Sequence, residues 1–127
     1  MSAKILAVDD TLEAVELLRL MLETGGFEAI TALTPQKALR LAAEEDGLSA
    51  ALLDLMMPDI DGLELCRRLR ANPETTNLAI IIITAANEPE VEIRVEAAGA
   101  DALIYKPVDL HDLITRLNEV LAARGLA

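Results

Sequence analysis

The chain has 127 residues, enough for one domain with a proper core, and 53% of them are hydrophobic although only 2% are aromatic. The core is therefore expected to consist of aliphatic side chains. The formal net charge of −11 argues against nucleic acid or an anionic membrane as a direct partner, because both require a basic surface.

Strand and helix patterns alternate five times along the chain. Short apolar runs predict strands at residues 4–8, 27–33, 50–53, 79–83 and 102–105. Apolar residues at helical spacing follow each run, and the five predicted helices end near Thr24, near Gly47, before Asn72-Pro73, at Gly99 and near Leu121. The fourth helix is expected to start near residues 87–88.

This alternation predicts an α/β fold with a doubly wound, five-stranded parallel sheet that helices cover on both faces. The expected strand order is 2-1-3-4-5, a flavodoxin-like three-layer sandwich whose switch point lies between the first and third strands. The sequence shows no linker, repeat or low-complexity stretch, so residues 1–127 are expected to form one domain without an output domain.

No apolar run reaches the roughly 18 residues that a membrane span needs. The N-terminal apolar run is too short for a signal peptide and leads straight into acids. Cys66 is the only cysteine, so no internal disulfide can form, and we expect it to lie in the core. Together these features predict a cytoplasmic protein.

Chemically active residues follow four of the five predicted strands: Asp9-Asp10, Asp54, Thr84 and Lys106-Pro107. Because the carboxyl ends of parallel strands share one edge of the sheet, these side chains should gather in one crevice. Three carboxylates so close together repel one another and need a cation. A lysine and a hydroxyl beside them suit an anion that binds transiently.

The pattern Asp9-Asp10, the run from Asp54 to Gly62, Thr84-Ala85 and Lys106-Pro107 resembles the receiver domain of bacterial two-component response regulators. The resemblance covers essentially the whole chain, and the chain is similar to a single receiver of the chemotaxis-regulator type. It implies a module that accepts a phosphoryl group from a histidine kinase or a histidine phosphotransfer protein. The surface of the fourth helix, fifth strand and fifth helix would then change for a downstream partner or output domain. Such a module catalyses its own phosphorylation and dephosphorylation without turning over an external substrate, so it is not an enzyme in the usual sense.

The resemblance also implies a role for each matching residue. Asp54 is the phosphoacceptor; Asp10 and Asp54 bind Mg²⁺, or alternatively Mn²⁺, directly; Asp9 acts through a coordinated water; and the backbone carbonyl of Met56 is a further metal ligand. No other cofactor is expected.

Four residues around the phosphoryl group have implied roles as well. Lys106 supplies a positive charge, with a cis bond to Pro107 that aims it into the crevice. The hydroxyl of Thr84 donates to a phosphoryl oxygen, and the backbone amide of Ala85 is a second donor. The small side chain of Ala85 leaves room for the phosphoryl group.

Two positions depart from the family pattern. Many members carry Tyr or Phe three residues before the lysine, where this chain has Leu103, while its one tyrosine is Tyr105. The two share a strand face, so Leu103 and Tyr105 are the candidates to replace the usual aromatic switch, Tyr105 as a partial substitute. Many members that dimerise through this surface read Asp-Asp where this chain has Asp101-Ala102, which weakens, without excluding, a phosphorylation-dependent homodimer.

Other classes fit the sequence less well. Haloacid dehalogenase phosphatases need Asp-x-Asp after the first strand, and Asp9-Asp10-Thr11 lacks that spacing. A flavin-binding electron carrier of this topology needs a Ser/Thr/Gly-rich phosphate loop and aromatic residues, whereas the chain has one Tyr, one Phe and no Trp. A receiver-like interaction module that acts without phosphorylation remains the alternative, against which the complete set of acids, Thr84 and Lys106 argues.

Overall fold

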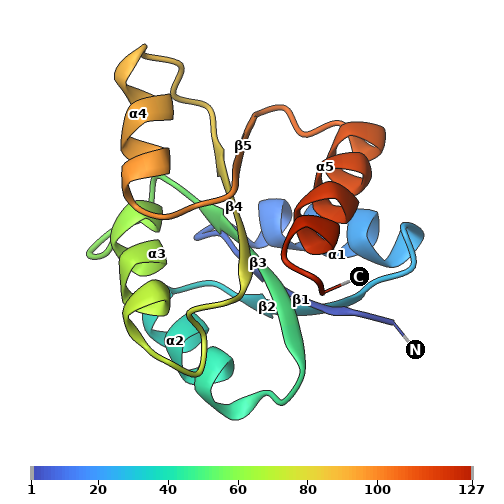
Figure 1. Cartoon of the computed structure of the whole chain (residues 1–127). Helices are drawn as coiled ribbons and strands as arrows, with labels where there is room; N and C mark the ends of the chain where they lie inside the picture. Colours follow the sequence, from blue (N-terminus) through green and yellow to red (C-terminus); the bar gives the residue numbers. More distant parts are fainter. Residues whose placement is uncertain (1, 127) are drawn as a thin grey trace.

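The computed structural model describes residues 2–126, in which five strands alternate with five helices (Figure 1). The strands are β1 (Lys4–Val8), β2 (Glu28–Ala32), β3 (Leu48–Asp54), β4 (Ala79–Thr84) and β5 (Ala102–Tyr105). The helices are α1 (Leu12–Thr24), α2 (Pro35–Glu44), α3 (Gly62–Ala71), α4 (Glu90–Ala97) and α5 (Leu110–Ala123). None of these helices has the length and apolar character that crossing a membrane demands.

The strands form one parallel sheet in the order β2-β1-β3-β4-β5, which confirms the predicted topology. Helices α1 and α5 cover one face, and α2, α3 and α4 cover the other (Figure 1). The fold is therefore the predicted doubly wound, flavodoxin-like three-layer sandwich. Its switch point lies between β1 and β3, because the chain leaves these two strands toward opposite faces of the sheet.

The central strand β4 shows why its sequence is apolar without alternation. Ile80 and Ile82 belong to the core beneath α2, α3 and α4, whereas Ile81 and Ile83 belong to the core beneath α1 and α5. A strand that is buried on both faces needs an apolar side chain at every position. As expected from the composition, both cores are aliphatic, and Cys66 is buried in the first one.

Helix α4 begins at Glu90, two to three residues later than predicted. Pro89 precedes it, and the residue before a proline is sterically disfavoured in helical geometry, so Asn87 and Glu88 stay outside. No side chain caps the start of this eight-residue helix. By contrast, side chains cap the other four helices, at Thr11, Thr34, Asp61 and Asp109. Helix α4 therefore has the weakest local support of the five.

Helices α1 and α5 approach each other closely at Gly25, where α1 ends. A Cβ at Gly25 would overlap the side chain of Ile114 on α5. The next residue, Gly26, has φ 89°, a left-handed conformation that side chains rarely adopt. The Gly25-Gly26 pair thus both ends α1 and allows α5 to pack against that end.

Candidate functional site

The carboxyl edge of the sheet carries the candidate site. Asp9 and Asp10 follow β1, Asp54 ends β3, Thr84 ends β4 and Lys106 follows β5. Strand β3 lies between β1 and β4, and β5 lies on the far side of β4, so four neighbouring strand ends contribute to the site. This is the edge at which doubly wound sheets bind their ligands.

Three of these residues form a carboxylate cluster. One oxygen each of Asp9, Asp10 and Asp54 lies within 4.8 Å of the other two; Asp9 and Asp54 are buried, and Asp10 is exposed. The side-chain donors are therefore all carboxylate oxygens, without imidazole or thiolate. Such a set suits a hard divalent cation.

Asp9 is held in place from two sides. Its Oδ1 atom accepts hydrogen bonds from the backbone amide and the hydroxyl of Thr11, at 3.1 and 3.3 Å. Its Oδ2 atom accepts one from Nζ of Lys106 at 3.1 Å. Because Thr11 is also the N-cap of α1, the start of this helix and the carboxylate position each other.

Lys106 connects the acids. Its Nζ atom lies 3.3 Å from Oδ1 of Asp54, in addition to its bond with Asp9. Partial burial opposes its charge, but the hydrogen bond to Asp9 and the charge of Asp54 together raise the pKa of Lys106 above its ordinary value. The peptide bond between Lys106 and Pro107 is cis, as predicted.

Asp54 is also buried, with 5% of its surface exposed. Burial raises the pKa of Asp54 above its ordinary value, the neighbouring Asp9 raises it further, and Lys106 opposes both effects. A carboxylate in this position gains from any added positive charge, whether a bound cation or a closer approach of Lys106.

The loop after Asp54 returns close to its own start. The backbone amide of Leu55 donates to the carbonyl of Ile83 on β4 at 2.9 Å, and the amide of Gly62 donates to the carbonyl of Leu55 at 2.9 Å. A Cβ at Gly62 would overlap the carbonyl oxygen of Asp54. Sequence reasoning placed Gly62 in a turn but missed this contact, because the spacing alone does not reveal which backbone atoms meet.

Thr84 is fully buried at the end of β4, and its Oγ1 atom accepts a hydrogen bond from the amide of Ala86 at 3.0 Å. A hydroxyl can accept and donate at once, so this bond does not use the hydroxyl proton of Thr84. Ala85, between them, is exposed. The hydroxyl therefore links the end of β4 to the loop that leads to α4.

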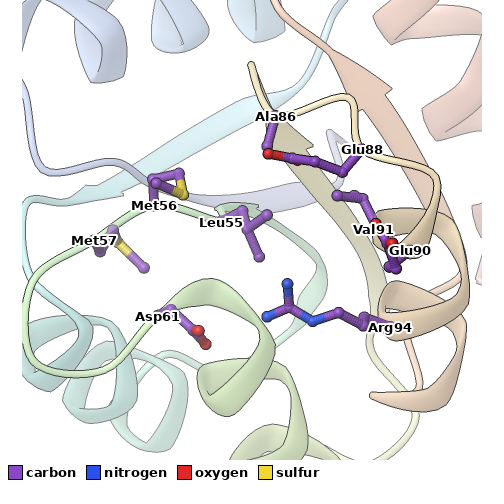
Figure 2. Close-up of a pocket in the computed structure, with 9 residues that line it drawn as sticks. All are labelled: Leu55, Met56, Met57, Asp61, Ala86, Glu88, Glu90, Val91 and Arg94. Carbon is purple, nitrogen blue, oxygen red and sulfur yellow. The ribbon is translucent and has the colours of Figure 1, made fainter.

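A hollow of about 820 Å³ lies beside this loop (Figure 2). Leu55, Met57 and Val91 form apolar walls, and Arg94 extends into the hollow from α4 (Figure 2). Met56, whose backbone carbonyl is a predicted metal ligand, has a side chain that is 66% exposed at its edge. The hollow therefore separates the loop after Asp54 from α4.

The two residues that bear on the aromatic switch, Leu103 and Tyr105, occupy different environments. Leu103 packs against the core beneath α2, α3 and α4. Tyr105 is 39% exposed, and its hydroxyl donates to Oε1 of Glu92 on α4 at 3.4 Å. The tyrosine thus contacts α4 from the outside of the sheet edge.

Comparison with known proteins identifies the family. Residues 5–118 match the response regulator receiver domain. The chain is 40% identical over 121 residues to the phosphate regulon transcriptional regulatory protein PhoB of Rhizobium meliloti, covering 95% of this chain and 53% of that protein. The chain therefore spans about half the length of this relative.

Solved structures agree with the sequence match. The chemotaxis protein CheY4 of Vibrio cholerae superposes with a TM-score of 0.89 at 28% identity, covering 95% of this chain and all of that chain. A CheY-like receiver domain protein of Methanospirillum hungatei superposes with a TM-score of 0.89 at 30% identity, covering 98% of both chains. The protein belongs to the response regulator receiver domain family, whose members are phosphoacceptor signalling modules.

Proposed function

We propose that Asp54 is the residue that accepts the phosphoryl group, from a histidine kinase or a histidine phosphotransfer protein. One observation carries this proposal: Asp54 belongs to the acid cluster and contacts Lys106, and, unlike Asp9, whose Oδ1 atom is held by Thr11 at the start of α1, it is not tied to a helix cap. Asp54 stands at the end of β3, on the carboxyl edge of the sheet, with 5% of its surface exposed.

The chain's own groups account for the transfer. A carboxylate oxygen of Asp54 attacks phosphorus, the bond from phosphorus to the donor's histidine nitrogen breaks, and an aspartyl phosphate forms. In the unmodified chain, Nζ of Lys106 lies 3.3 Å from Asp54. After the transfer it binds a phosphoryl oxygen. The Thr84 hydroxyl donates to another oxygen and draws its loop inward. The chain thereby promotes its own modification, and hydrolysis by water reverses it.

Asp9, Asp10, Asp54 and the Met56 carbonyl would hold the metal ion, for which Mg²⁺ is the first candidate and Mn²⁺ the second. When bound, the ion neutralises charge that spreads over the phosphoryl oxygens. Their oxygen-only chemistry supports this choice, and the raised pKa of Asp54 indicates a site in need of positive charge.

The donor's approach is proposed to follow α1. Leu12, Leu17 and Leu20 are exposed on this helix at 62%, 50% and 61%. Leu17 also lines an apolar groove of about 460 Å³ that reaches Asp9 and Lys106. A helix of the donor that lies in this groove would bring its phosphohistidine to the acid cluster.

The output is proposed to be a shift of conformational population on the α4, β5 and α5 side, because Thr84 connects the site to the loop before α4. A downstream protein or output domain would read this side. We further propose that residues 1–127 act as one cytoplasmic domain. Receiver-like action without phosphorylation is not favoured, since the complete acceptor set is assembled.

The test is intact-mass measurement after incubation with acetyl phosphate and Mg²⁺, with and without chelator. The expected result is a metal-dependent gain of one phosphoryl group that Asp54→Asn abolishes. Asp59→Asn makes the same chemical change in the same loop and should phosphorylate normally. A gain of the same size and rate in Asp54→Asn would refute the assignment.

A further inference from the structure

The hollow beside the loop after Asp54 has two walls that come from different parts of the chain. Leu55 and Met57 lie on the loop that follows β3, and Val91 lies on α4 (Figure 2). These three side chains are buried members of the core beneath α2, α3 and α4, so the apolar walls are fixed. At about 820 Å³, the hollow falls within the range of about 300–1,000 Å³ that is typical of small-molecule sites.

Arg94 places a positive charge between these apolar walls. Its side chain leaves α4 and extends toward the wall that contains Leu55 and Asp61 (Figure 2). Glu90 precedes Arg94 by four residues, a spacing at which opposite charges on a helix commonly pair. Nevertheless, no salt bridge among residues 2–126 involves Arg94. Its planar guanidinium is therefore open to a carboxylate, which it can bind through two parallel hydrogen bonds.

Three carboxylates line the same hollow: Asp61 at the start of α3, and Glu88 and Glu90 around the start of α4. One oxygen of Asp61 accepts a hydrogen bond from the backbone amide of Glu64 at 2.9 Å. Within residues 2–126, no salt bridge neutralises any of the three acids. Among the lining residues that the structure describes, Arg94 is the one cation, so a simple anion would meet an excess of negative charge. A simple cation would instead leave Arg94 unpaired.

A ligand that carries both charges on an apolar body complements the whole lining. We propose that the hollow binds a free apolar α-amino acid, with its carboxylate on Arg94, its ammonium group among the three carboxylates and its side chain against the apolar walls. The inference does not depend on whether Asp54 accepts a phosphoryl group. Because the hollow separates the loop after Asp54 from α4, the bound amino acid would bridge these two elements.

The test is titration of the ¹⁵N-labelled protein with L-leucine, without metal or phosphoryl donor. Leucine should give saturable shifts of the amide signals of residues 55–57 and 86–94, with a Kd of the order of 1 mM. Three analogues each remove one part of the ligand: isocaproate lacks the ammonium group, isoamylamine lacks the carboxylate, and glycine lacks the apolar body. Each should bind about tenfold more weakly than leucine, because part of the lining loses its partner. The absence of saturable shifts with leucine, or equal affinity for any analogue, would overturn the inference.

Variants of exposed arginines test the role of Arg94. Arg94→Met keeps the apolar stem of the side chain and removes its charge, so it should weaken leucine binding about tenfold. Arg40→Met makes the same change at an exposed position on α2 and should keep the affinity within about twofold. Equal weakening by these two variants would show general attraction and refute the site.

Charge reversal gives a second readout that loss of structure could not produce. Arg94→Glu should bind isoamylamine more tightly than leucine, because the ligand carboxylate now meets a like charge. An unchanged preference for leucine would refute the contact. Phosphorylation is followed separately by intact mass with acetyl phosphate and Mg²⁺. Leucine binding without a phosphoryl gain would support the site and count against the proposed function, whereas a gain without leucine binding would refute the site alone.

Discussion

Replacing Asp54 with Asn should stabilise the metal-free protein while it abolishes phosphorylation. The substitution keeps the shape of the side chain and removes one charge from the cluster. In the wild-type chain, burial and the neighbouring Asp9 raise the pKa of Asp54, which means that its ionised form is disfavoured in the folded state. Unfolding relieves this conflict, so removal of the charge favours the folded state.

The magnitude follows from the geometry. The oxygens of Asp9, Asp10 and Asp54 lie within 4.8 Å of one another, and two charges at that limit repel by about 3.5 kcal/mol at an effective dielectric constant of about 20. Asp9 contributes a repulsion of this order and the exposed Asp10 a smaller one, which Nζ of Lys106 at 3.3 Å largely offsets with about 5 kcal/mol of attraction. The unfavourable burial of the charge, which is the largest influence on the pKa of Asp54, therefore remains. Loss of part of the lysine hydrogen bond lowers the expected gain to about 1–2 kcal/mol.

The assay is urea unfolding in chelator and again in Mg²⁺, with Asp59→Asn as the control for the same chemical change outside the cluster. In chelator, Asp54→Asn should unfold at higher urea than the wild type, and the control should stay within about 0.5 kcal/mol. Mg²⁺ should stabilise the wild type by binding the folded state, and it should stabilise the variant much less.

The pH dependence provides an internal check. Because the pKa of Asp54 is higher in the folded than in the unfolded chain, its favourable contribution is complete below the unfolded value and is lost as pH rises through the folded value. The stability gain of Asp54→Asn over the wild type should therefore be absent near pH 3 and grow from about pH 4 toward neutrality. A variant less stable than the wild type at pH 7 in chelator would refute the reasoning.

Three further substitutions test other parts of the structure. Lys106→Ala should slow phosphorylation by acetyl phosphate tenfold or more, because the phosphoryl oxygens lose their fixed cation; an unchanged rate by intact mass would contradict its role. Gly62→Ala should destabilise by about 1–3 kcal/mol in urea unfolding, since its Cβ would meet the carbonyl of Asp54, and unaltered stability would contradict that contact. Asp101→Ala should lower the free energy of unfolding by about 2–4 kcal/mol, because it removes the acceptor shared by two arginines and the amide of Ile80. A loss below about 0.5 kcal/mol in the same urea assay would show that these donors find other partners.

The fold and the gathering of site residues were accessible from sequence because they follow from rules of topology. Alternating patterns predict a parallel sheet, and the carboxyl ends of its strands share an edge, so Asp9, Asp10, Asp54 and Lys106 had to meet. The cis bond before Pro107 was expected from the family resemblance alone, since an X-Pro bond is cis in only about 5–6% of cases.

Features that depend on three-dimensional packing were not accessible. Helix α4 starts later than predicted because Pro89 sterically disfavours helical geometry in the residue before it, although the sequence pattern there favours a helix. The close approach of Gly62 to Asp54 and of Gly25 to Ile114 involves pairs whose contact no local pattern encodes. The outward contact of Tyr105 with Glu92 likewise depends on where α4 lies relative to β5.

The missing cap on α4 has a consequence for how the protein could respond to its ligands. In a helix of eight residues without a side-chain cap, the first turn unfolds at a small cost in free energy. By contrast, α1 is capped by Thr11 and closely packed on α5 at Gly25. Among the helices, hydrogen exchange should therefore be fastest in α4 and slow across the interface of α1 and α5. A donor that approaches along α1 would meet the same conformation at every encounter. A downstream protein that binds beside α4 would select among several conformations of that helix.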